Sequence, residues 1–330
     1  MIQNRHALTF LGCAFALLLA SPRARAQTAE QARAAPVELN VTVTDARWRL
    51  VTGLTRESFL VYENKSPREI VSFGEGGSPL SVGIVFDVSA SVTINAEVLD
   101  EARRALLDFA RRGGGSNEYF VIGFNKASHL LADWTRDPAA VAAGLSALTP
   151  LQNKGKDGTV FYDAVHEALG KFGGASNAKR VLLVVSDGAD HGSRHKSSEV
   201  RRMAAAGGVL VYALGVYRHE IAGTGPNEEA RRNLSALCRA SGGRDFYLET
   251  FRTPWQAKVA RADPAAEVKA ALETITLELS NQYLIRFRPS PPSAKPEWRR
   301  VEVRVRAPGI TEKSFPVRAR EGYVSGGTTN

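Results

Sequence analysis

Three oxygen-bearing side chains at the end of an apolar run offer ligands for a hard cation. Residues 82–86 are apolar and rich in β-branched side chains, which is typical of a strand buried on both faces. Asp87 ends this run, and Ser89 and Ser91 follow at alternate positions, so the three side chains can turn toward one point in a tight loop. Carboxylate and hydroxyl oxygens are ligands that Mg²⁺ prefers. Because the hydroxyls are neutral, they leave the charge of a divalent ion available to an outside carboxylate.

A simpler role is open to the same residues, since an Asp or Ser that follows a strand often caps the next helix. Two further segments favour a shared site. Thr159 follows a glycine-containing loop and precedes an amphipathic pattern, where it could itself be an N-cap, and Asp187 ends a second apolar run at residues 180–186. In open α/β sheets, ligands bind beyond the carboxyl ends of the strands. Two strand-end aspartates and a loop hydroxyl therefore fit one site better than three separate caps.

With these residues in view, the chain resembles the von Willebrand factor type A domain over roughly residues 80–280. The segment Asp-Val-Ser-Ala-Ser at 87–91 matches the DxSxS signature of that family, and Thr159 and Asp187 fall where the family places its metal-binding threonine and second aspartate. The resemblance implies a metal-ion-dependent adhesion site for Mg²⁺ (or Mn²⁺), completed by an acidic residue of a partner protein or peptide. The metal ligands that it implies are Asp87, Ser89, Ser91, Thr159 and Asp187.

Flanking segments extend the resemblance beyond this domain. The chain is similar to the VWFA-related Acidobacterial domain family, a group of bacterial secreted proteins. Val92 stands where such proteins often carry Met, and we expect no effect on the metal. The segments that carry the resemblance are residues 41–45, 51–55, 59–64, 79–83, 186–193, 282–285 and 319–323.

Two residues just beyond Asp187 are candidates for the outer part of the site. Asp190 could accept a hydrogen bond from a metal-bound water, but in a glycine-flanked loop it is more often a turn residue, which is the interpretation we favour. His191 could reach the rim of the site, although contact with solvent alone is the simpler reading.

The alternative function is a metal-dependent hydrolase or phosphatase on a similar sheet. An aspartyl phosphatase of the haloacid dehalogenase type has a second Asp two residues after the first, and Ser89 occupies that position here. The candidate general bases are His166, His191 and His195, but no nucleophile–base pair is visible. A scaffold that has lost its metal is a third possibility, and the complete set of five ligand types argues against it. We therefore predict a binding module and no enzyme.

The pattern along the chain predicts an α/β fold inserted in a β-sandwich. Alternating strands and helices over residues 79–278 indicate a doubly wound, mostly parallel sheet covered on both faces; the segment around Trp134 is expected to be a connection. At the chain ends, period-two alternation indicates half-buried strands. Neither end alone supplies enough strands for a stable sheet. We therefore expect residues 36–78 plus 279–325 to form one small antiparallel sandwich, with strands at 59–64 and 68–73 and at 315–319.

The first 26 residues have the features of a signal peptide. Arg5 and His6 precede an apolar run at residues 7–20, and Ala24-Arg25-Ala26 matches a cleavage signal. We expect cleavage after Ala26, a mobile segment at residues 27–35, and a secreted or periplasmic protein. An uncleaved membrane anchor is the alternative, but the apolar run is short for a span.

Cysteine usage and charge exclude other classes. After cleavage only Cys238 remains, so no internal disulfide can form; its helical spacing predicts a small buried residue. The net charge of +9 includes three leader arginines, and much of the excess lies in arginines near the C-terminus that alternate with apolar residues. A nucleic-acid surface would need a basic patch with aromatic stacking platforms. We therefore expect no nucleic-acid partner and no stable membrane insertion after cleavage.

Overall fold

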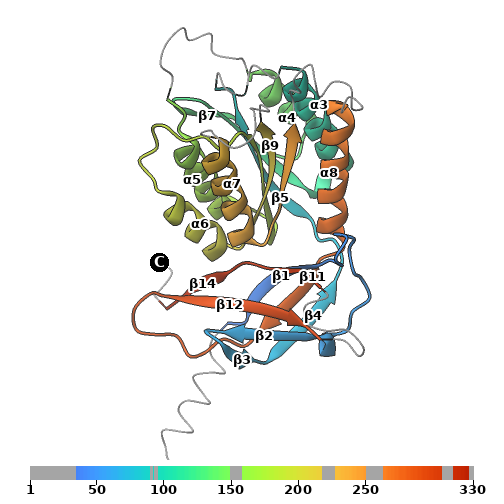
Figure 1. The fold of residues 1–330 in the computed structure, drawn as a ribbon, viewed down its shortest axis with the longest axis vertical. Coiled ribbons are helices and arrows are strands. Elements are labelled where there is room, and N and C mark those ends of the chain that lie inside the picture. The colour runs from blue at the N-terminus through green and yellow to red at the C-terminus, as the bar shows by residue number, and fades with distance from the viewer. Residues whose placement is uncertain are drawn as a thin grey trace, which may run out of the picture.

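The computed structural model describes residues 35–89, 92, 96–148, 158–217, 227–249, 263–306 and 315–326. They form an α/β domain with a β-sandwich beside it (Figure 1). The expected signal peptide, nearly all of the segment 27–35, and Ser91 lie outside the described residues. No helix in the described ranges combines the length and the apolar character needed to span a bilayer.

A six-stranded sheet forms the centre of the α/β domain, in the order β10-β9-β8-β5-β6-β7. All neighbouring strands pair in parallel except β7, which is antiparallel to β6 at one edge. The expected doubly wound, mostly parallel sheet is thus confirmed. Its strands are β5 (Leu80–Asp87), β6 (Glu118–Phe124), β7 (Ser128–Thr135), β8 (Lys179–Ser186), β9 (Val209–Tyr217) and β10 (Asp245–Glu249).

Helices cover both faces of this sheet (Figure 1). One face packs against α3 (Ala96–Arg112), α4 (Pro138–Ser146) and α8 (Pro264–Ser280). The other packs against α5 (Phe161–Lys171), α6 (Ser197–Ala206) and α7 (Asn227–Ser241). Every residue of β5 is buried, and successive side chains enter opposite cores, Ile84 on one face and Val85 on the other. Cys238 is fully buried on α7, as expected for a small buried residue.

Two Asp-Pro pairs determine where helices begin. Asp137 and Asp263 are the N-caps of α4 and α8, and each carboxylate accepts a hydrogen bond from the backbone N–H two residues later. Proline at the first helical position lacks only an N–H that would have no partner inside the helix. Short 3₁₀ helices lie at Arg56–Ser58, Gly114–Ser116 and Phe172–Gly174.

The β-sandwich is built from both ends of the chain, as expected. Each of its two antiparallel sheets mixes strands from the two ends, because β1 pairs with β11 and β2 pairs with β12. One sheet has the order β13-β1-β11-β4 and the other β14-β12-β2-β3. Leu39, Val61 and Ile285 belong to the core between them. The strands are β1 (Val37–Val43), β2 (Phe59–Glu63), β3 (Ser66–Arg68), β4 (Ile70–Glu75), β11 (Tyr283–Phe287), β12 (Glu297–Val305), β13 (Val317–Arg318) and β14 (Gly322–Ser325).

The structure corrects three local predictions. The segment around Trp134 is a strand, β7, and not a simple connection. The turn after β2 lies at Asn64 and Lys65, both with positive φ, a conformation that suits a two-residue hairpin. Pro67 therefore lies in β3. This strand is at the edge of its sheet, where a proline without an N–H is tolerated. The strand expected at 315–319 shrinks to the two residues of β13, and the unexpected β14 follows it.

The chain passes between the two domains at neighbouring points. Residues 76–79 connect β4 to β5, and residues 281–282 connect α8 to β11. The N–H of Gly76 donates to the carbonyl of Gln282 at 3.3 Å. Beside this junction, buried Glu278 of α8 forms an ion pair with Arg318 of β13 at 2.5 Å. The parallel strands run away from the sandwich, so their carboxyl ends lie at the far end of the α/β domain (Figure 1).

Candidate metal centre

The two aspartates singled out from the sequence meet where the strand order of the central sheet reverses. From β5 the chain goes to β6 on one side, while β8 lies on the other side. Asp87 is the last residue of β5, and Asp187 directly follows β8. The register pairs Phe86 with Val185, which brings the two strand ends together. Such a switch point is the usual ligand site of a doubly wound sheet.

Asp87 is fully buried and held by hydrogen bonds to both carboxylate oxygens. Its Oδ1 accepts from the N–H of Ser89 at 2.8 Å, and its Oδ2 accepts from the hydroxyl of Ser186 at 2.7 Å. The Ser186 hydroxyl in turn accepts from the N–H of Gly188 at 2.9 Å. Ser186 therefore links the two loops, a role that sequence reasoning missed because only the cross-strand register reveals it.

The electrostatics of this pair fit a cation. Burial, followed by the negative charge of Asp187, raises the pKa of Asp87 to about 7, although hydrogen bonds from Ser89 and Ser186 oppose the shift. The two carboxylates are removed from water and repel each other, and hydroxyl oxygens lie beside them. Such a set of oxygens matches the donors that a hard divalent ion prefers. Ser89 and Asp187 are only 4% and 7% exposed, so both lie beneath the protein surface beside Asp87.

Thr159 is fixed between the loops that follow two strands. The N–H of Val160 donates to the carbonyl of Asn125, after β6, at 2.8 Å. The N–H of His191, after β8, donates to the carbonyl of Thr159 itself at 2.8 Å. The N-cap of α5 is Val160, so the reading of Thr159 as an ordinary N-cap is wrong. Its buried side chain belongs to the same edge of the sheet as Asp87.

Asp190 accepts a hydrogen bond from the hydroxyl of Ser193 within its own loop and also caps a neighbouring helix. Its Oδ1 accepts from the N–H of Tyr162 at 3.3 Å, and the hydroxyl of Ser193 accepts from the N–H of Asp163 at 3.0 Å. Both N–H groups belong to the first turn of α5, so the loop after Asp187 caps a helix 30 residues earlier in the chain. His191 is exposed, and its N–H is the group that holds Thr159.

The remaining candidate bases are directed elsewhere. His166 on α5 and His195 before α6 stack on each other, with ring centroids 3.7 Å apart. In the described part of the chain, no hydrogen bond joins either ring to Asp87, Thr159 or Asp187. His195 instead contacts Asp163. Burial of Asp163 is outweighed by hydrogen bonds from the N–H groups of His195 and Arg194 and from the His195 ring, which lower the pKa of Asp163 to about 2.

Comparisons with known proteins agree with this geometry. The family model of the von Willebrand factor type A domain matches residues 82–189, from within β5 to just beyond Asp187. No curated protein matches the chain. The flanking resemblance to the VWFA-related Acidobacterial domain family stays a prediction.

Several solved structures are similar to the chain. The conserved hypothetical protein BatB from Bacteroides thetaiotaomicron is 20% identical, covering 59% of this chain and 99% of that chain, with a TM-score of 0.42. Proximal thread matrix protein 1 from the mussel byssus, with a zinc-occupied MIDAS motif, is 12% identical, covering 62% and 48%, with a TM-score of 0.44. The vWF domain of the pili tip protein Mfa5 from Porphyromonas gingivalis is 12% identical, covering 62% and 97%, with a TM-score of 0.44.

At these identities and scores the likenesses carry no functional weight, and the resemblance rests on the matched segment. That segment contains most of β5, all of β6 and β8, and their strand-end loops. Residues 82–189 of the α/β domain therefore match the von Willebrand factor type A domain.

Proposed function

We propose that this chain is a secreted or periplasmic protein-binding module whose activity depends on a divalent cation. In this proposal Mg²⁺ (or Mn²⁺) is held by five side chains, and a carboxylate of the partner completes its coordination shell. The observation that carries the proposal is the fully buried Asp87 next to Asp187 at the switch point of the sheet. The proposed ligands are Asp87, Ser89, Ser91, Thr159 and Asp187.

The donor chemistry supports a metal that can accept a further anionic ligand. Two carboxylates balance the charge of a divalent ion, and the three hydroxyls add no negative charge. A partner Asp or Glu supplies a charged oxygen ligand for the remaining coordination position, whereas an amide oxygen is neutral and a weaker ligand. Oxygen donors of this kind select a hard cation.

Binding fits the site better than hydrolysis does. A hydrolase needs a base within hydrogen-bond reach of the attacking water. His166 and His195 are stacked on each other, and the ring of His195 is engaged with Asp163. His191, the remaining histidine near the site, is exposed and contributes its backbone N–H to the site.

Calorimetric titration of Mg²⁺ or Mn²⁺ into the chelator-treated chain tests the metal site. We expect one ion per chain, and no binding by Asp87→Ala, because the buried carboxylate cannot be replaced by a neighbouring group. Asp108→Ala is the matched control, since Asp108 lies on α3 with a side chain 54% exposed. Circular dichroism verifies that each variant is folded. Equal binding by wild type and folded Asp87→Ala, or no binding at all, would contradict the proposal.

The partner is tested separately by capture. Proteins of the native cell envelope are passed over the immobilised chain in Mg²⁺ and eluted with chelator. We expect acidic partners in the eluate, and conversion of the contacting Asp or Glu to its amide should abolish binding. Turnover in phosphatase or peptidase assays that disappears in both Asp87→Ala and His191→Ala would instead establish the hydrolase alternative.

A further inference from the structure

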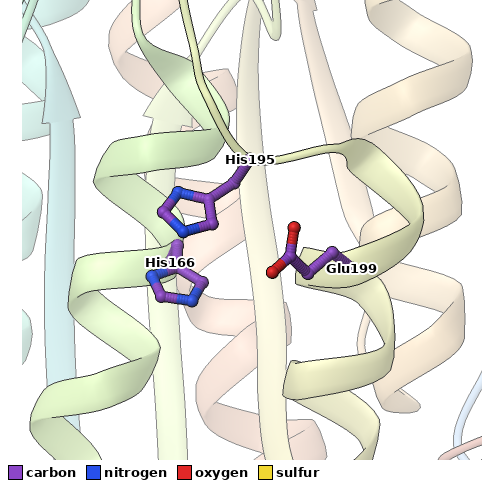
Figure 2. Close-up of side chains that lie close together, drawn as sticks. All are labelled: His166, His195 and Glu199. Carbon is purple, nitrogen blue, oxygen red and sulfur yellow. The ribbon is translucent and has the colours of Figure 1, made fainter.

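Three potential metal ligands lie together on the helical face formed by α5 and α6. His166 comes from α5, His195 from the loop before α6, and Glu199 from the first turn of α6. One ligand atom of each lies within 4.8 Å of the others. Figure 2 shows the two imidazole rings one beside the other, with the Glu199 carboxylate next to them. This cluster is separate from the donors around Asp87.

A carboxylate fixes the orientation of one ring. Nδ1 of His195 lies 2.7 Å from Oδ1 of Asp163. The same Asp163 oxygen also accepts from the N–H of His195 at 3.0 Å. A carboxylate next to Nδ1 places the ring proton there and leaves Nε2 with its lone pair free of a proton. A histidine ligand held by a carboxylate in this way is a recurrent feature of protein metal sites.

The other two groups are placed so that they can complete a site. His166 lies one turn after Asp163 on α5, so both face the same loop, and its ring is nearly parallel to that of His195, at 10°. Glu199 is exposed, so its side chain can approach the rings at little steric cost. In the part of the chain that the structure describes, no ion pair holds its carboxylate.

We propose that His166, His195 and Glu199 form a binding site for a divalent transition metal of the zinc type. Two imidazoles and one carboxylate are a known zinc ligand set that leaves a coordination position open. Ligand atoms around one zinc ion lie about 3–4 Å apart, given bond lengths of about 2.1 Å, so the cluster needs only a small contraction and a ring rotation that breaks the stack. Imidazole nitrogen favours zinc over Mg²⁺, which distinguishes this site from the one proposed at Asp87.

A metal bound by His166, His195 and Glu199 would link α5 to the loop that follows Asp187, and both belong to the site proposed around Asp87. The loop from Asp187 to His195 already caps α5 through Asp190 and Ser193. A metal held by His166 and His195 adds a bond between this loop and the body of α5, whose N-terminus follows Thr159. The site therefore stabilises the loop that carries Asp187 without touching the ligands around Asp87.

Zinc titration of the full chain by calorimetry tests the proposal. The Asp87→Asn background removes the other candidate site, and there we expect one zinc per chain. His166→Ala and His195→Ala should each weaken zinc binding at least tenfold, and Asp163→Asn about 10–100-fold. His129→Ala is the matched control, because His129 lies exposed on β7 and its loss should leave the affinity unchanged.

The outcomes are separable from those of the proposed function. If Asp87→Asn does not fold, as judged by circular dichroism, the wild type is titrated instead, and His166→Ala should remove one zinc while sparing any other. Unchanged zinc affinity in both His166→Ala and His195→Ala would overturn the proposal. A failure of Mg²⁺ to bind near Asp87 would leave this test unaffected.

Discussion

Asp87 should make the metal-free protein less stable as the pH rises. Burial and the charge of Asp187 raise its folded-state pKa to about 7, whereas an Asp in an unfolded chain titrates near about 3.9. Between these values the folded state keeps a proton that the unfolded chain has released. Each pH unit in this window therefore lowers the free energy of unfolding by about 1.4 kcal/mol. The free energy of unfolding changes little below about pH 4 and falls by about 2 kcal/mol between pH 5 and pH 7. The total decrease reaches about 4 kcal/mol near pH 8.

The variant Asp87→Asn isolates this contribution, because it keeps the size of the side chain and removes its titration. Urea unfolding in chelator, at pH 5, 6, 7 and 8, gives the free energy of unfolding of both proteins. We expect the wild-type value to fall by about 2 kcal/mol relative to the variant between pH 5 and 7. Adding Mg²⁺ at pH 8 should raise the wild-type value by about 2.7 kcal/mol at 100 times the dissociation constant, with no effect on the variant. A wild-type-to-variant difference that is constant or that rises with pH would refute the reasoning.

Two substitutions and one deletion should reduce the stability or solubility of the protein through specific contacts. Gly188→Ala, at a φ of +76° with the new Cβ 2.8 Å from the carbonyl of Ala230, should lower the free energy of unfolding by about 2 kcal/mol in urea. Glu278→Gln removes the buried negative charge that pairs with Arg318 and Arg244 and should lower the free energy of unfolding by about 3 kcal/mol; a shift below the error of urea unfolding would argue against a structural role for these ion pairs. Deletion of residues 283–325 should expose the apolar faces of β1 and β2 and cause aggregation in light scattering, whereas a soluble monomer would contradict a shared core.

The start of α8 is an example of a boundary that the sequence itself contains, because the helix begins at the Asp263-Pro264 pair. β7 was missed because it is a half-exposed edge strand with a register irregularity, so its identity depends on pairing with β6. The sequence of residues 128–135 alone does not indicate which strand they pair with.

In the candidate site, too, some features follow from local sequence and others depend on tertiary structure. The residue types at Asp87, Thr159 and Asp187 could be predicted, because each follows a strand or precedes a helix with a clear period. The hydrogen bond from Ser186 to Asp87 depends on strand register, which periodicity does not give. The contact of His166 with His195 joins positions 29 residues apart on different elements, and only the packing of α5 against the loop before α6 brings them together.

The two neighbouring passages between the domains determine how the molecule would carry a mechanical load. Residues 76–79 and 281–282 both lead into one sheet, where β4 and β11 are adjacent and antiparallel. A pulling force applied at the far end of the α/β domain therefore enters both strands at the same end and in the same direction. Such tension does not slide β4 past β11. The force is resisted instead by the pairing of β11 with β1 and by the core between the two sheets of the sandwich.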